Sequence, residues 1–293
     1  LQGRVFRCPQ AMPLVRYPLH GEQERRTQMF LGSELAHHPD FTPLQRFYIR
    51  LLGVPIVGLR IRARNVFSLI PASRNYGEIL DAGCGLGVFA FELARRFPRA
   101  NVLGIDLLPS MVQGAEHIRR KVGLENLRFQ MTDLRDLPVG DRFDLAICVD
   151  ILEHIEDDVS ALQSLHRLLR PGGILVLHVP ALYRRYPVWR KQQNFDVQGH
   201  VRPGYQIADI REKVRKVGFL CLEDGYTYGF LETLANNLSY RITRARMENR
   251  HLYALAFPVL NLLSWLGARS RPKELGAGIF LVAEKGAYSS PSA

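Results

Sequence analysis

The chain has 293 residues, 47% of them hydrophobic and 23% charged, which is ordinary for a soluble globular protein and enough to bury a full core. Its four cysteines include no C-x-x-C pair, which argues against a disulfide framework or a zinc site and fits a reducing compartment. The net charge of +11 divides into +6 for residues 1–78, −3 for residues 79–179 and +8 for residues 180–293. Basic flanks indicate an anionic partner or an arginine-rich, well-solvated surface.

Residues 1–72 are predicted to form an irregular arm followed by a helical cap. Apolar residues recur at helical spacing between Thr42 and Ile70, which indicates one or two helices. Pro55 marks the expected break between them, because proline interrupts the helical hydrogen-bond pattern.

Short apolar runs then alternate with amphipathic stretches through residues 73–225, which we expect to be the core domain. We expect residues 226–273 to be an inserted helical segment, and residues 274–293 to hold the last core strand and a tail. The expected helices are 87–97, 109–123, 157–173 and 203–217, and the expected strands are 77–83, 101–106, 126–133, 143–150, 174–180, 219–225 and 276–286. This alternation predicts an α/β fold: a Rossmann-like, doubly wound, seven-stranded, mostly parallel sheet, with an N-terminal helical cap and a helical insertion before the last strand.

A glycine-rich turn follows the first predicted strand in the sequence "DAGCGLG", residues 81–87. Its glycines permit positive φ angles and a close approach of a ligand to the backbone. The helix that follows presents free N–H groups at the same place. Purely structural glycines would give the same pattern, so this turn is weak evidence on its own.

Two carboxylates strengthen the prediction of a nucleoside ligand. Asp106 ends the second predicted strand, 19 residues after Gly87, where a carboxylate can accept hydrogen bonds from ribose hydroxyls. Asp133 ends the third strand, where it can meet an adenine amino group. The glycines follow G-x-G-x-G, and Val88 stands where a dinucleotide-binding pattern needs glycine.

These segments resemble class I S-adenosylmethionine-dependent methyltransferases, most closely the small-molecule type found in ubiquinone and menaquinone biosynthesis. The likeness is carried by "EILDAGCGLG", "VLGIDLLPSMV", "MTDLRDLP", "FDLAICVDILEHI" and "LLRPGGILVLHVP". It is strong over about residues 77–180, weaker through residues 199–219, and absent from residues 1–70 and from the insertion.

The resemblance implies S-adenosyl-L-methionine as the cofactor and assigns residues to its parts. Asp81, Gly83, Cys84, Gly85 and Gly87 would surround the methionine half, and Asp106 would hold the ribose. Leu107 and Met111 would flank the adenine, with Asp133 and Leu134 at its edge, and Val149 and Asp150 would lie close to the sulfonium. No metal ion is expected.

The chemistry requires an acceptor atom in line with the methyl group and, for a hydroxyl acceptor, removal of a proton. His154 follows the fourth strand and His200 precedes the helix expected from Pro203. Each is a candidate base or positioning group, and each has a structural alternative as a loop histidine. Tyr205 is a weaker candidate that suits packing better.

Nucleic acid is not the expected acceptor. The fourth-strand motif reads V-D-I-L-E-H and lacks both the Asn/Asp-Pro-Pro-aromatic run of amino-directed base methylation and the Pro-Cys nucleophile of C5-cytosine methylation. We therefore expect methyl transfer to a small apolar acceptor such as a quinone, a lipid or a polyketide-like molecule. The alternatives are an RNA-directed methyltransferase and a noncatalytic protein that binds the cofactor.

The insertion contains 17 residues, His251 to Gly267, without Asp, Glu, Lys or Arg. Pro258 and Asn261 interrupt this run, and it is short for a membrane span. Flanking arginines suit an amphipathic helix at an anionic bilayer surface. A lid over the sheet or a contact with a second subunit would explain the same run. We expect a cytoplasmic protein, or one bound peripherally at the inner face of the membrane. The flanking arginines are Arg241, Arg244, Arg246, Arg250, Arg269 and Arg271.

Overall fold

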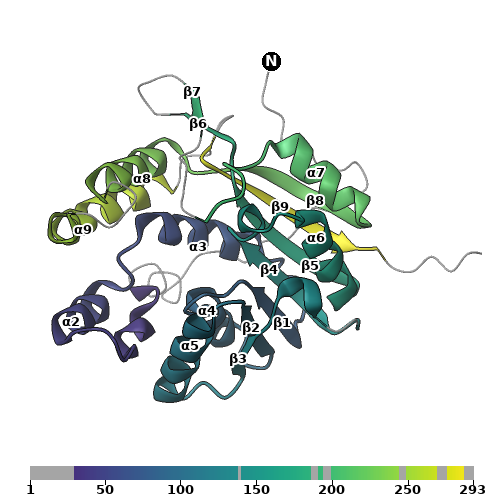
Figure 1. Ribbon diagram of the computed structural model, residues 1–293, viewed down its shortest axis with the longest axis horizontal. Coiled ribbons are helices and arrows are strands. Elements are labelled where there is room, and N and C mark those ends of the chain that lie inside the picture. Colours follow the sequence, from purple (N-terminus) through teal and green to yellow (C-terminus); the bar gives the residue numbers. More distant parts are fainter. Residues whose placement is uncertain are drawn as a thin grey trace, which may run out of the picture.

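The computed structural model describes residues 30–137, 140–185, 191–193, 199–243, 249–268 and 276–286, and these residues form a seven-stranded sheet with helices on both faces (Figure 1). The sheet confirms the predicted Rossmann-like fold. Its strands are β1 (Glu78–Ala82), β2 (Asn101–Asp106), β3 (Leu127–Met131), β4 (Phe143–Val149), β5 (Leu169–Pro180), β8 (Phe219–Thr227) and β9 (Gly278–Lys285).

The strand order is β3-β2-β1-β4-β5-β9-β8. The first five strands in this order pair in parallel, and β9 runs antiparallel to both β5 and β8. The strand order reverses between the neighbouring strands β1 and β4, so the chain leaves β1 toward one edge of the sheet and leaves β4 toward the other. This arrangement leaves room for a ligand at their carboxyl ends. All the predicted cofactor residues come from this end of the sheet.

Alternate residues of each strand pack on opposite faces, because side chains of a strand point alternately up and down. Ile79 and Ile147 face the core formed with α3, α4 and α5, whereas Leu80 and Cys148 face the core formed with α6 and α7. The helices on these faces are α3 (Val57–Leu69), α4 (Val88–Arg96), α5 (Pro109–Val122), α6 (Asp158–Leu168) and α7 (Ile207–Lys216).

The N-terminal cap contains η1 (Ser33–His37), α2 (Pro43–Leu52) and α3. Thr42 and Gln45 form a capping box at the start of α2, which satisfies two backbone donors reciprocally. The chain leaves the helix at Gly53, and Pro55 lies in the link before α3, so the predicted break is confirmed. The predicted arm lies mostly outside the described residues, as does the C-terminal tail from residue 287.

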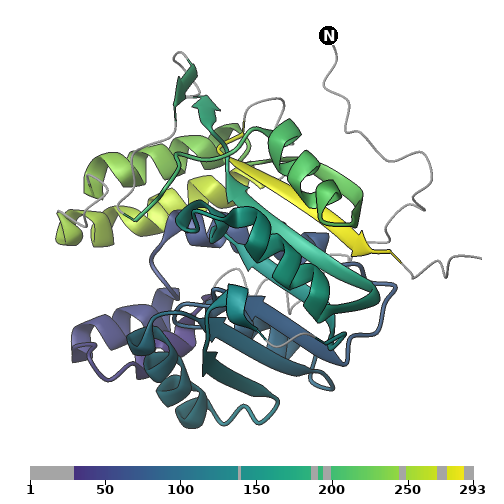
Figure 2. The ribbon, with the colours of Figure 1, turned by 45° about the vertical axis from the view of Figure 1, so that its right-hand side comes forward.

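The insertion between β8 and β9 contains α8 (Phe230–Thr243) and α9 (Arg250–Gly267). These helices lie side by side at one end of the molecule, and α3 lies next to them (Figure 2). Tyr253, Phe257 and Leu260 of α9 pack with Val57 and Ile61 of α3 in a separate apolar cluster. The division into domains at residues 72, 225 and 273 stays a prediction.

Two predicted boundaries were wrong. The helix expected from Pro203 begins at Ile207, because Tyr205 is held extended by its bridge to Ala181 and by the bond from its N–H to the Pro180 carbonyl. The helix expected to end at the Pro171-Gly172-Gly173 turn already ends at Leu168, and β5 begins at Leu169. A register shift lets the Pro171–Gly173 segment bulge from the ladder with β4. The short hairpin of β6 (Tyr183–Arg185) and β7 (Lys191–Gln193) was not predicted.

Candidate active site

The glycine turn lies where β1 ends and α4 begins. The N–H groups of Gly83 and Cys84 both donate to the Ile105 carbonyl of β2 at 2.8 Å, which pins the turn to the neighbouring strand. Gly83 and Gly85 have φ angles of 79° and 52°, in the region that favours glycine. A Cβ at Gly83 would collide with Ile151, whereas a Cβ at Gly85 would meet no atom within 4 Å. The turn is therefore packed on one side and open on the other.

Asp81 lies one residue before the end of β1, and its buried carboxyl group has an unsatisfied oxygen. Its side chain is 2% exposed, and Oδ2 has no hydrogen-bond partner among the described residues. Burial raises the pKa of Asp81 to about 7, because a low-dielectric surrounding disfavours the charged form. Buried polar atoms are normally paired, so this oxygen marks a place where a ligand donor fits.

Asp106 ends β2 directly beside the turn. Its Oδ2 accepts a 2.8 Å bond from the Gly85 N–H, and its Oδ1 accepts a 3.0 Å bond from the Leu108 N–H. Each oxygen keeps a second lone pair. The carboxylate is thus oriented by the backbone and can still accept from a vicinal pair of hydroxyls.

Apolar side chains lie near the carboxyl ends of β2 and β3. Leu107 is 62% exposed directly after Asp106, Met111 is partly buried on α5, and Leu134 is buried. Exposed apolar side chains beside an oriented carboxylate suit a flat ring. Asp133 caps the η2 turn (Leu134–Asp136) by accepting from the Arg135 N–H. It also forms an ion pair of 2.6 Å with the Arg135 guanidinium, which holds the pKa of Asp133 below its usual value.

A buried polar network follows Val149 at the end of β4. Asp150 Oδ1 lies 2.6 Å from His178 Nδ1, and Asp150 Oδ2 lies 2.8 Å from Arg62 Nη1. His178 Nε2 lies 2.9 Å from the Thr227 hydroxyl. Burial alone would raise the pKa of Asp150, but Arg62 and His178 hold it below its usual value. The structure therefore keeps one anionic carboxylate at the carboxyl end of β4.

The network holds Asp150 in an uncommon backbone conformation. Its φ is 53°, in the left-handed region that costs a non-glycine residue about 1–3 kcal/mol. Asp150 also donates its N–H to the His178 carbonyl. Both the side chain and the backbone of Asp150 are thus bonded to β5. These bonds fix the direction in which the chain enters the loop after β4.

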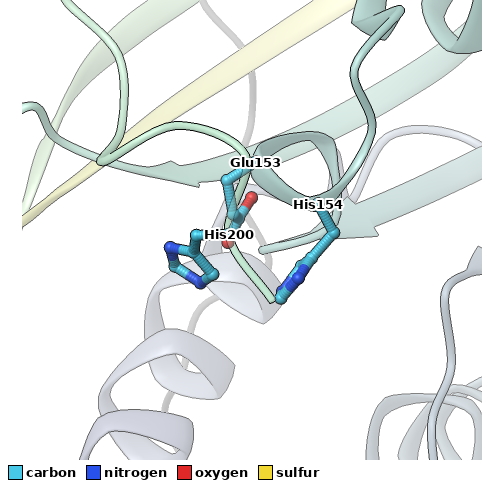
Figure 3. Close-up of side chains that lie close together, drawn as sticks. All are labelled: Glu153, His154 and His200. Carbon is cyan, nitrogen blue, oxygen red and sulfur yellow. The ribbon is translucent and has the colours of Figure 1, made fainter. Parts of the chain in front are cut away.

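His154 and His200 come together beside this loop, although 45 residues separate them in the sequence. Their rings meet edge to face with centroids 4.6 Å apart, and the Glu153 carboxyl group lies next to both (Figure 3). His154 Nδ1 lies 2.9 Å from the Gly199 carbonyl oxygen. Burial and the neighbouring Asp150 raise the pKa of Glu153 well above its usual value.

The segment that carries His200 is anchored to the loop after β4. The Val201 N–H donates to the Glu153 carbonyl at 2.9 Å, and Arg202 donates to the Leu152 carbonyl at 3.0 Å. Arg202 and Tyr205 also bond the buried carboxylate of Asp158, at 2.7 and 2.9 Å. Tyr205 is therefore part of this anchor, in agreement with the structural alternative for that residue.

The two core cysteines are not set up as nucleophiles. Cys84 and Cys148 are both buried, and burial raises the pKa of each thiol well above its usual value. A reactive cysteine needs an accessible thiolate. The geometry thus supports packing as the role of Cys148.

Four residues of this site were missed by sequence reasoning: Arg62, Glu153, His178 and Thr227. His178 gave a signal, because it is one polar residue within the apolar strand "ILVLHVP". Arg62 gave a weaker signal, as one of three arginines in the helix of residues 57–69. Thr227 gave none, since only the pairing of β8 with β9 brings it to His178.

Comparison with known proteins agrees with this geometry. A family described as "methyltransferase domain" matches residues 74–217. A trans-aconitate 2-methyltransferase of Deinococcus radiodurans is 40% identical over 121 residues, which are 41% of this chain and 43% of that protein. A ubiquinone biosynthesis O-methyltransferase of Haemophilus ducreyi is 33% identical over 106 residues, 34% of this chain and 44% of that protein.

Residues 74–217 form a class I S-adenosylmethionine-dependent methyltransferase domain. The chain spans less than half the length of either curated relative. A methyltransferase of Mesorhizobium loti has the same fold, with a TM-score of 0.51 at 20% identity, over 78% of this chain and 99% of that one. A protein described as a [4+2]-cyclase also has this fold, with a TM-score of 0.54 at 21% identity, over 78% and 82% of the two chains.

The residues present fit S-adenosylmethionine as the cofactor of this methyltransferase domain. The unsatisfied Oδ2 of buried Asp81 suits the cationic amino group of the methionine half. The open side of the turn at Gly85 and the oriented carboxylate of Asp106 suit a ligand lying along the turn. Leu107 and Met111 offer the apolar surfaces that an adenine ring needs.

Proposed function

We propose that the protein transfers a methyl group from S-adenosylmethionine to a small apolar acceptor. The observation that carries the proposal is the pair of carboxylates beside the glycine turn. Asp81 has a buried oxygen without a partner, and Asp106 is oriented by two backbone N–H groups. Together they suit the amino group and the ribose of one extended ligand.

The bound cofactor supplies a methyl group on a positively charged sulfur. In the proposed complex Asp81 pairs with the amino group, and Asp106 accepts from the ribose hydroxyls. Leu107, Met111, Asp133 and Leu134 surround the adenine. Val149 and the anionic Asp150 end the strand that lies nearest the reacting end of the ligand, as the family resemblance implies. Their positions at the carboxyl ends of β2, β3 and β4 support these assignments.

His154 and His200 are the proposed groups that face the acceptor. When His154 donates its Nδ1 proton to the Gly199 carbonyl, its Nε2 keeps a lone pair. An exposed imidazole in this form can take a proton from an acceptor hydroxyl. His200, held by the anchored loop, can orient the same acceptor.

Several observations support a small acceptor rather than nucleic acid. Both curated relatives named above act, by their names, on small molecules. The thiol of Cys148 is buried within β4, so it cannot serve as the nucleophile of cytosine methylation. The residues after β4 also lack the run typical of amino-directed base methylation.

An exposed apolar stripe supports the lipid-like part of the proposal. On α9 it comprises Leu252, Leu255, Val259, Leu262 and Leu266, and on α2 it comprises Leu44, Phe47 and Leu51. Both sets recur at helical spacing. The two helices touch where the Tyr48 hydroxyl donates to the Ala254 carbonyl at 2.6 Å.

The charges near α9 favour an anionic bilayer as the partner of this stripe. Arg241 and Arg250 are exposed at the facing ends of α8 and α9. The other four arginines that flank the apolar run lie outside the described residues. Among the described helices, none has both the length and the apolarity to cross a bilayer. We therefore propose peripheral contact, at the inner face of the membrane, in which the stripe inserts shallowly.

Incubation with methyl-labelled cofactor tests the proposed activity. Label should enter a quinone- and lipid-containing extract but not RNA or DNA. Asp106→Ala should abolish most of this transfer, whereas Asp209→Ala, at an exposed position on α7, should not. Faster labelling of RNA than of the extract would contradict the small-molecule proposal, and binding without turnover would indicate a noncatalytic protein.

A further inference from the structure

Glu153, His154 and His200 form a cluster of three metal-ligating residue types beside the acceptor side of the site. Glu153 and His154 belong to the η3 turn (Leu152–His154), and His200 comes from the anchored loop before α7. One potential ligand atom of each residue lies within 4.8 Å of the other two. The three side chains converge on one small volume (Figure 3).

Among the described residues, the Glu153 carboxyl group lacks a hydrogen-bond partner for one of its oxygens. Its side chain is 1% exposed, and Oε2 has no hydrogen-bond partner among the described residues. A buried carboxylate is normally paired with donors or coordinates a metal ion. The nearby Arg202 guanidinium donates its hydrogen bonds to the Leu152 and Glu156 carbonyls, the Asp158 carboxylate and the Tyr205 hydroxyl.

His154 has the hydrogen-bond arrangement of a metal ligand. Its Nδ1 lies 2.9 Å from the Gly199 carbonyl, so the N–H donates there and the Nε2 lone pair is presented to a ligand. Metal-bound histidines almost always donate their other ring N–H to a carbonyl or carboxylate, which fixes the tautomer and the ring orientation.

We propose that Glu153, His154 and His200 bind a divalent transition-metal ion of the zinc class. Two imidazoles and one carboxylate suit such an ion and leave at least one coordination position open. Ligand atoms around zinc at about 2.1 Å lie roughly 3.4 Å apart, so the cluster contracts by about 1.4 Å from its 4.8 Å limit. The exposed His154 side chain and the His200 loop can supply this movement. None of the ligands is a cysteine, which is why the cysteine spacing gave no sign of the site.

The open position gives the ion a role in the proposed methyl transfer. An oxygen of the acceptor can bind there, and coordination lowers the pKa of a hydroxyl so that its proton is lost to solvent more readily. When the ion is bound, Nε2 of His154 is a ligand and cannot also accept a proton, so activation by the ion then replaces the proposed base role of His154. The role of the ion rests on the proposed function, whereas the binding of the ion does not.

Cobalt binding to the untagged full chain tests the site directly. The protein is stripped with EDTA, dialysed and titrated with Co²⁺, whose visible absorption reports its coordination by nitrogen and oxygen ligands, and Zn²⁺ is then added in competition. We expect saturation at one ion per chain and displacement by Zn²⁺. His154→Ala, His200→Ala and Glu153→Gln should each weaken binding at least about tenfold. The matched control is His251→Ala, at an exposed position at the start of α9.

The cobalt titrations of wild type and variants decide whether the metal site exists. Saturable binding that is lost in the histidine variants and retained in His251→Ala would establish the site. No saturable binding to wild-type protein, or binding that is unchanged in both His154→Ala and His200→Ala, would overturn it. His154 is exposed, so its variant should fold even if Glu153→Gln does not.

Calorimetry with S-adenosylmethionine on the same metal-free protein separates this inference from the proposed function. Cofactor binding without cobalt binding would refute the metal site alone. Cobalt binding without cofactor binding would refute the methyltransferase proposal alone.

Discussion

His178 of β5 and Asp150 of the β4 end lie 2.6 Å apart, Nδ1 to Oδ1, and this contact joins two neighbouring strands at the centre of the site. Arg62 reaches the other oxygen of Asp150 from the N-terminal cap. One carboxylate thus ties β4, β5 and α3 together. The contribution of the Asp150 carboxylate to the free energy of unfolding therefore depends on whether this group is charged.

We expect Arg62→Met and His178→Asn each to lower the free energy of unfolding at pH 7 by about 1–3 kcal/mol, because each removes a hydrogen bond to a partly buried charge. Urea denaturation measures this. The double variant should cost less than the sum of the single variants, since both act on Asp150. His251→Ala should lie within about 0.5 kcal/mol of wild type.

The same network predicts an acid-dependent loss of stability. The pKa of Asp150 is lower in the folded protein than its usual value near 4. Its contribution is therefore fully present above about pH 4 and is lost as the pH falls through the folded-state pKa. The difference in stability between wild type and Arg62→Met should shrink below about pH 4. A difference that stays constant down to about pH 2 would show that Asp150 is not the group involved.

Cofactor affinity should rise with pH because of Asp81. Burial raises the pKa of this carboxyl to about 7, so it is mainly protonated in the free protein below that pH. The protonated form stabilises the fold fully below about pH 4, and this contribution is lost as the pH rises through 7. Pairing with a cationic amino group needs the anion, so cofactor affinity should fall up to about tenfold per pH unit below 7.

Calorimetry between about pH 5.5 and 8.5 checks this behaviour. Asp81→Asn should bind the cofactor weakly and without that pH dependence, since its amide does not titrate. An unchanged pH profile in Asp81→Asn would assign the titration to another group.

Asp106→Ala should weaken binding of S-adenosylmethionine at least about tenfold, because it removes the acceptor of two ribose hydrogen bonds worth roughly 1.5–3 kcal/mol each. Calorimetry measures this affinity, on a variant whose circular dichroism spectrum is unchanged. Asp209→Ala is the matched control, since its carboxylate is exposed on α7. Equal affinity in Asp106→Ala and wild type would refute the ribose assignment.

The exposed stripe of α9 should bind anionic liposomes at low salt. Leu255 and Val259 are 80% and 68% exposed, so replacing both with Ser should reduce co-sedimentation without harming the fold. Each basic residue near the surface contributes about 1 kcal/mol, so binding should also weaken with salt. Leu220→Ser, on an exposed position of β8, is the control.

Wild-type protein that stays in the supernatant at low salt would contradict the membrane proposal. Gel filtration then distinguishes a contact between two copies of the chain from a monomer with an exposed stripe. The inner face of α9 is buried on α3 and α8, and the described residues leave its outer face exposed.

The sequence by itself determined the sheet, the glycine turn, and the carboxylates at the ends of β1 and β2. Local patterns encode these features: strands alternate with amphipathic helices, and each predicted cofactor residue lies within a few positions of a strand end. Such signals need no knowledge of distant contacts. The predicted start of the helix at Pro203 was wrong because a distant strand end, at Pro180, holds Tyr205 extended.

Only the tertiary structure decided which residues meet at the acceptor side. Arg62, Asp150, His178 and Thr227 lie in or next to four different elements and span 166 positions of the sequence. His154 meets His200 because Val201 and Arg202 anchor the segment before α7 to the loop after β4. Ion pairs and strand pairs between such distant residues produce no periodic pattern in the sequence, because the partners are brought together only by the folded structure. The apolar run of α9 was likewise visible in the sequence, but its division into a buried and an exposed face depended on where α3 and α8 pack.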